Sequence, residues 1–285
     1  GLAVWLGAGT VAEGAYLQLV FFVASTLLMM MLNNTNSLIR IYSRMVSCSF
    51  VAMTCAATFL FSSLESCATS MCFILFYLSL LRSYQDKRAP GIAFYSFACL
   101  GIASLFFVQI LYFVPFLWIL MASNMMALTH RMFWATVLGL VMPYWFAVGY
   151  YVVTNQFDAF IDHFAELAQF EPLLQYEALD IHRIATFGLV VLLAVIGIIH
   201  YMRNSYLDKI RTRMIFEMFI TVDILSFVFI ILQPQHFDNL LPIIIVNTSC
   251  LFAHYVALTR TWLTNVTFIV MCLATLGLTI FNLMP

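Results

Sequence analysis

Charged side chains are scarce in this sequence: 9% of its 285 residues are Asp, Glu, Lys or Arg, whereas 64% are hydrophobic. A water-soluble fold cannot bury that much apolar surface, so the composition excludes a soluble globular protein. The 12 basic residues are balanced by 13 acidic ones, and this balance is unlike the clustered positive charge of a nucleic-acid-binding protein. We therefore expect the lipid bilayer as a partner and no nucleic acid.

Short segments of alternating polarity, which build outer-membrane barrels, are also missing. The apolar runs are long and continuous, and a spanning helix needs about 20 such residues. We predict an all-α fold, a polytopic transmembrane helical bundle of about ten spans that forms a single transmembrane domain over residues 1–285. The expected spans lie near 15–32, 46–62, 66–82, 91–108, 110–128, 132–153, 185–202, 214–232, 240–258 and 264–283.

The first nine residues are apolar and begin with Gly1 rather than methionine. They lack the basic stretch of a secretory signal and resemble the tail of an earlier span. We expect a further span to precede them.

Basic residues orient this array, because cytoplasmic loops near span ends carry an excess of Lys and Arg. Eleven of the twelve basic residues follow odd-numbered spans, and only Arg183 falls on the opposite side. We therefore expect both ends of this sequence outside the cytoplasm and an inner-membrane location. The eleven are Arg40, Arg44, Arg82, Lys87, Arg88, Arg131, Arg203, Lys209, Arg211, Arg213 and Arg260.

The segment 154–184 is the only sizeable extracytoplasmic loop in this topology. Apolar residues recur at helical spacing between Phe157 and Ala168, which predicts an amphipathic helix with its phenylalanines against the membrane domain and its acids in water. The acids of the loop are Asp158, Asp162, Glu166, Glu171, Glu177 and Asp180.

Asp158, Asp162 and His163 are the candidate catalytic residues, because paired carboxylates beside a histidine can act as a base or hold a divalent ion for a pyrophosphate substrate. The alternative is a solvated helix face. Two further external clusters, 180–183 and 236–239, lack metal-site spacing, and no two of the seven cysteines form a Cys-x-x-Cys pair. We expect no metal and no cofactor.

Ionisable residues inside the membrane are functional candidates, because burying a charge in lipid is costly. Asp223 lies near the middle of its span and must be neutral or paired, while Glu217 can pair with Arg213 near the cytoplasmic surface. Both are candidates for a substrate or proton path, as are the polar residues Asn124, Asn247 and His254, which more commonly bind helices together.

Arg40 and Arg44 lie in a short amphipathic run after the first span. Basic residues at the cytoplasmic interface meet anionic headgroups, so we expect these two arginines to contact lipid.

Three stretches, 37–44, 64–82 and 241–255, the last lying before Arg260, together resemble an uncharacterised family of multispanning bacterial inner-membrane proteins over most of the chain. The resemblance implies a helical fold and that location, but no activity. Three functions stay open: a non-enzymatic component of a cell-envelope assembly or export machine, with other membrane proteins as partners; an enzyme on lipid-linked sugars, of glycosyltransferase or glycan polymerase type; or a small-solute or lipid transporter. The glycosyltransferases usually carry acids in the first external loop, which here is very short.

Overall fold

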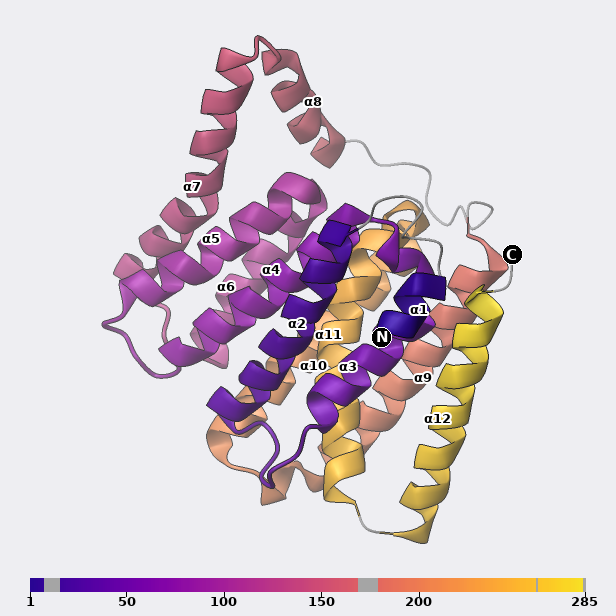
Figure 1. Ribbon diagram of the computed structural model, residues 1–285. Coiled ribbons are helices and arrows are strands. Elements are labelled where there is room, and N and C mark those ends of the chain that lie inside the picture. The colour runs from indigo at the N-terminus through magenta and orange to yellow at the C-terminus, as the bar shows by residue number, and fades with distance from the viewer. Residues whose placement is uncertain (8–15, 169–178, 260, 284–285) are drawn as a thin grey trace. The chain divides into compact units, whose positions relative to one another are not determined.

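The computed structural model describes residues 1–7, 16–168, 179–259 and 261–283, and every regular element within them is a helix (Figure 1). The predicted all-α class is therefore confirmed for the described residues. Seven helices in this part of the chain are long and apolar enough to cross a membrane, as in a multi-pass membrane protein. They are Tyr16–Asn36, Leu64–Ser83, His130–Val153, Ile181–Leu207, Ile210–Leu232, Pro234–Leu258 and Thr264–Leu283.

Three of the ten expected spans coincide with shorter apolar helices, Met45–Ala56, Pro90–Phe106 and Val108–Ser123. The first is interrupted at Ala57, whose backbone leaves the helical region (φ −94°, ψ 63°) before a 3-10 turn. The second ends before Phe107, which is extended (φ −143°, ψ 93°). The count of ten spans is thus not confirmed.

The chain divides into two compact units, of which unit 1 comprises Gly1–Met71 and Gln175–Pro285. Helix α4 (Leu64–Leu80) begins in unit 1 and ends in unit 2. The other elements of unit 1 are α1 (Leu2–Gly7), α2 (Tyr16–Asn36), α3 (Met45–Ala56), η1 (Thr58–Phe61), α9 (Ile181–Asn204), η5 (Ser205–Leu207), α10 (Ile210–Leu232), η6 (Pro234–His236), α11 (Phe237–Leu258) and α12 (Trp262–Leu283).

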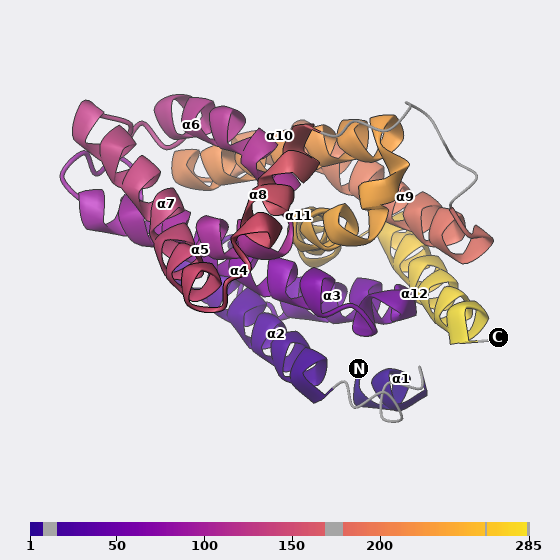
Figure 2. The ribbon, with the colours of Figure 1, turned by 90° about the horizontal axis from the view of Figure 1, so that it is seen from above.

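Helix α11 is the centre of unit 1. Every residue from Leu240 to Tyr255 is buried, and α3, α9 and α10 pack around it (Figure 2). Helix α9 approaches α11 closely at Gly197, where a Cβ would lie 2.9 Å from the backbone of Leu251. The position of α11 explains why its polar residues must find partners inside the protein.

The loops of unit 1 make side-chain contacts at its two opposite ends. These ends are about 36 Å apart, the length of the 24-residue helix α9. At the basic end, the segment after α2 meets η5 and the start of α10: Arg40 donates to the Leu207 carbonyl and Arg211 donates to Asn36. At the Arg183 end, the starts of α4, α9 and α11 meet around Arg183 and Asp238. This grouping places Arg40 and Arg211 at one end of unit 1 and Arg183 at the other, and which end is cytoplasmic stays a prediction.

Unit 2 spans Cys72–Leu174, and its closest helix pair is α5 and α7. A Cβ at Gly139 would lie 2.3 Å from the Phe94 carbonyl oxygen, so only glycine permits this approach. Gly101 of α5 lies in a reciprocal position, where an added Cβ would be 2.6 Å from the Leu140 carbonyl oxygen. The elements of unit 2 after α4 are η2 (Leu81–Ser83), α5 (Pro90–Phe106), η3 (Val108–Phe113), α6 (Val114–Ser123), α7 (His130–Val153) and α8 (Phe157–Ala168).

Helix α8 lies within the predicted 154–184 loop and folds back on α7 and η3. The rings of Phe160 and Phe164 lie 6.4 and 5.0 Å from that of Tyr144, and both phenylalanines are half-buried. Tyr112 also donates a hydrogen bond to the Leu167 carbonyl. Residues 169–178 of this loop are outside the described part, and its extracytoplasmic placement stays a prediction.

Candidate functional site

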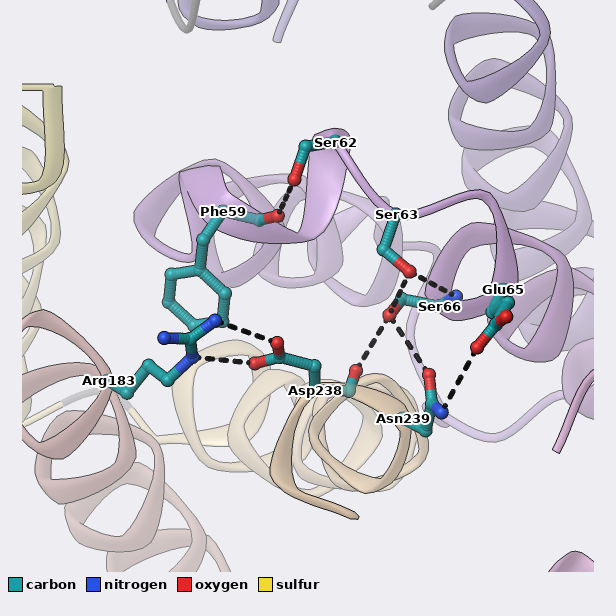
Figure 3. A network of polar contacts seen from close by, with 8 residues as sticks. All are labelled: Phe59, Ser62, Ser63, Glu65, Ser66, Arg183, Asp238 and Asn239. Carbon is teal, nitrogen blue, oxygen red and sulfur yellow. Dashed lines mark hydrogen bonds and ion pairs between the residues drawn. The ribbon is translucent and has the colours of Figure 1, made fainter. Parts of the chain in front are cut away.

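A bidentate ion pair joins the clusters 180–183 and 236–239, which the sequence presented separately. Arg183 Nε and Nη2 of α9 donate to Asp238 Oδ1 and Oδ2 of α11 at 2.9 and 2.8 Å (Figure 3). The guanidinium carbon also lies 5.5 Å from the centroid of the Phe59 ring, within cation–π range. Because the side chains are 33% and 41% exposed, the pair contributes little stability by itself but fixes the geometry of the two helix ends.

Ser66 extends this network to the start of α4. Its Oγ lies 2.8 Å from the Asp238 carbonyl oxygen, 3.3 Å from Asn239 Oδ1 and 3.0 Å from Ser63 Oγ (Figure 3). Asn239 Nδ2 also donates to Glu65 Oε2 at 3.5 Å. These polar side chains form hydrogen bonds with one another and so link the starts of α4, α9 and α11.

Asp223, the candidate in the middle of α10, is fully buried. Thr248 Oγ1 of α11 donates to its Oδ2 at 3.0 Å, and Asn247 lies against the same carboxyl group. These contacts supply the partners that the sequence left unidentified. They join α10 to α11, as expected of a polar group that binds helices together.

We expect the Asp223→Asn variant to fold and function normally, because an asparagine oxygen can still accept the Thr248 hydrogen bond. Asp223→Leu removes the acceptor and is expected to lower the free energy of unfolding by about 1–3 kcal/mol. Thermal unfolding of the purified variants in detergent measures both. A folded Asp223→Asn protein that fails to support growth where the wild type is required would indicate a proton or cation path instead.

His254, also on α11, is fully buried and contacts Asp208 in the segment between η5 and α10. Its Nε2 lies 2.8 Å from Asp208 Oδ2, and the two side chains are 0% and 3% exposed. Its Nδ1 has no hydrogen-bond partner among the described residues. A neutral ring with the proton on Nε2 fits these contacts, because it donates to the carboxylate and leaves no N–H unsatisfied.

The remaining candidates for a substrate or proton path do not lie in a common site with Asp223 or His254. Glu217 is exposed on α10. Asn124 is buried at the end of α6, where Ser123 Oγ donates to its Oδ1 at 2.7 Å. The lipid candidates Arg40 and Arg44 are both exposed at the basic end.

The acidic residues of α8 and the neighbouring His163 lie in different environments. Asp158, Asp162 and Glu166 are exposed, whereas His163 Nε2 donates to the Ser104 carbonyl of α5 at 3.0 Å. The three candidate catalytic residues therefore share a helix without sharing a pocket, and the acids have the solvated position of the alternative interpretation.

Metal ligands are not gathered anywhere in the described residues, where no three His, Cys, Asp or Glu side chains lie close enough to hold an ion. All seven cysteines are free thiols, and Cys48 is exposed. The predicted loop acids Glu171 and Glu177 lie outside the described residues.

Comparison with known proteins adds no relative: no family model matches the chain, and neither a curated protein nor a solved structure is significantly similar to it.

Sequence reasoning missed Asp208 and the pairing of Thr248 with Asp223, which complete the two buried contacts of α11. Asp208 lies in a loop rich in basic residues, 46 residues before His254, and no local pattern links the two. A threonine in an apolar helix commonly bonds to a neighbouring helix, so Thr248 alone does not indicate which residue it contacts. The signal that could have found them is the requirement that each buried polar group needs a partner.

Proposed function

We propose that the protein is a non-enzymatic, multi-pass component of a cell-envelope assembly or export machine in the bacterial inner membrane. The observation that carries this proposal is the uncovered surface of α12, where only 6% of an apolar 18-residue segment within Thr264–Leu283 is buried. Gly277 on this helix is exposed, with no atom within 4 Å of the position of a Cβ. A small residue on an uncovered apolar helix lets a partner helix approach closely.

The interior of unit 1 supports the same proposal. Two fully buried ionisable residues, Asp223 and His254, are each used in contacts between segments of the chain itself. Such contacts stabilise a helical scaffold without requiring a chemical step.

A ten-span topology is part of the proposal. Helix α3 with η1 can extend over about 26 Å, and η3 with α6 over about 27 Å, when the larger rise of a 3-10 helix is included. The 17 residues of α5 reach about the same length. These lengths approach the hydrocarbon thickness of about 30 Å.

Sidedness is testable by labelling single cysteines in a cysteine-free background. We expect a membrane-impermeant thiol reagent to reach Glu166→Cys in intact cells, and Lys87→Cys only after the membrane is opened, because positive charge marks the cytoplasmic side. Both positions are exposed, so access is set by the membrane. Labelling of Lys87→Cys but not Glu166→Cys in intact cells would contradict the topology.

The assembly function is tested by purifying the tagged full chain in mild detergent. A membrane-protein complex of defined stoichiometry is expected, and Gly277→Leu should release its partner without unfolding the chain. Gly188→Leu on α9 is the matched control, because that glycine is also exposed with open space around it. A monomer that instead carries a polyprenyl lipid would contradict the assembly proposal.

The second candidate, an enzyme on lipid-linked sugars, is favoured by one observation. A polar cavity at the basic end is lined by Arg40 and Lys209, two residue types that bind phosphate groups. Co-purification of a polyprenyl phosphate lipid would favour this candidate.

A further inference from the structure

A cavity of about 380 Å³ opens at the basic end of unit 1. It lies between the segment that joins α2 to α3 and the segment that joins η5 to α10. Its volume falls in the range of about 300–1,000 Å³ that is usual for small-ligand sites. The polar side chains in its wall include Asn33, Ser37, Arg40, Lys209 and Thr212.

The wall of the cavity is held by a buried asparagine. Asn33, which is 6% exposed, donates from Nδ2 to the Ser43 carbonyl at 2.8 Å and accepts at Oδ1 from the Ile39 amide at 3.4 Å. Arg211 of α10 donates to Asn36 Oδ1 at 3.0 Å and so joins the two walls. The cavity is therefore bounded by tethered segments rather than by a loose loop.

Positive charge dominates this cavity. Arg40 and Lys209 line it and are both exposed. Asp208 also belongs to the wall, but its carboxylate lies 2.8 Å from His254 Nε2 and is almost fully buried. An anion in the cavity would thus meet two accessible cationic side chains and hydroxyl donors such as Thr212.

We propose that this cavity binds a phosphate-bearing anion, supplied either by a phospholipid headgroup or by a soluble phosphate. Guanidinium and ammonium groups form their strongest hydrogen bonds with such anions. Basic residues next to a membrane are also attracted to anionic lipids. This site goes beyond the proposed assembly function, which requires no small ligand.

The test uses the purified full chain and two probes, phosphatidylglycerol and inorganic phosphate. Native mass spectrometry measures phosphatidylglycerol retention against phosphatidylcholine, and calorimetry measures phosphate binding in nanodiscs of phosphatidylcholine. Arg40→Gln combined with Lys209→Gln is expected to weaken binding about 30-fold, because two charges next to the anion are lost. Arg203→Gln is the matched control, since Arg203 is exposed at the same end but does not line the cavity.

Asp208→Asn gives a prediction of opposite sign. It removes a negative charge from the wall while keeping an acceptor for His254, so anion binding should strengthen. If the double variant fails to fold, Lys209→Gln alone is measured and is expected to weaken binding about fivefold.

Each outcome decides the proposal. Retention of phosphatidylglycerol that depends on Arg40 and Lys209 supports a lipid source, and binding of inorganic phosphate with the same dependence supports a soluble source. Absence of binding by both probes would overturn the proposal. An equal loss in Arg203→Gln would also overturn it, because general surface charge would then explain the binding.

Discussion

Replacing Gly139 by alanine is expected to lower the free energy of unfolding by about 1–3 kcal/mol through overpacking. The added Cβ would lie 2.3 Å from the Phe94 carbonyl oxygen and 3.2 Å from the Ala98 amide nitrogen of α5. Both atoms belong to a helix backbone, so relief requires α5 and α7 to separate. Unfolding of the purified protein in increasing SDS, followed by intrinsic fluorescence, measures the loss.

Gly149→Ala is the matched control, because Gly149 is in the same helix and has nothing within 4 Å of its Cβ position. There the usual advantage of alanine over glycine inside a helix, about 1 kcal/mol or less, should remain. The two substitutions are chemically identical and are expected to change stability in opposite directions. Equal stability of the two variants would show that α5 and α7 do not pack as closely as described.

Asp208→Ala is expected to destabilise the basic end by about 3 kcal/mol, because it removes the carboxylate that accepts from His254 and leaves a buried N–H without a partner. The contact is 2.8 Å long and almost completely shielded from water. Thermal unfolding in detergent, combined with the His254→Leu variant in a double-mutant cycle, isolates the energy of the pair.

The control for this contact is Asp208→Asn, whose side-chain oxygen can still accept from His254 Nε2. It should lose much less stability than Asp208→Ala. If Asp208→Ala and Asp208→Asn unfold at the same temperature, or if the cycle gives no coupling, the buried contact does not stabilise the fold.

Hydropathy predicts where helices form, because each span must satisfy its own backbone in lipid. It predicts the ends less well. The first expected span, 15–32, corresponds to α2, which continues to Asn36 because Arg211 and the Leu32 carbonyl both bind the Asn36 side chain. The seventh, 185–202, begins early at Ile181, where the Asp180 side chain accepts from the first amide of α9. Such end contacts depend on distant segments or on single caps, which an average over apolar residues does not detect.

The sequence identifies candidate residues better than it identifies their partners. Asp223 and His254 were identified because a polar residue in an apolar run stands out, but their partners depend on which helices are neighbours. Arg183 was the one exception in the charge pattern, and its partner Asp238 is 55 residues away. The local sequence does not show which helices are neighbours in the bilayer, so these residue pairs can be identified only from the fold.

The central position of α11 has a consequence for synthesis. Helix α3 contacts it directly, yet α11 emerges from the ribosome roughly 190 residues later, which at about 5–20 residues per second is a delay on the order of ten seconds or more. During that interval α3, whose Val46, Phe50 and Met53 are buried in the folded unit, lacks its native contact with α11. Nascent chains arrested before α11 should therefore depend on an insertase or chaperone to shield α3, whereas chains arrested after α11 should not.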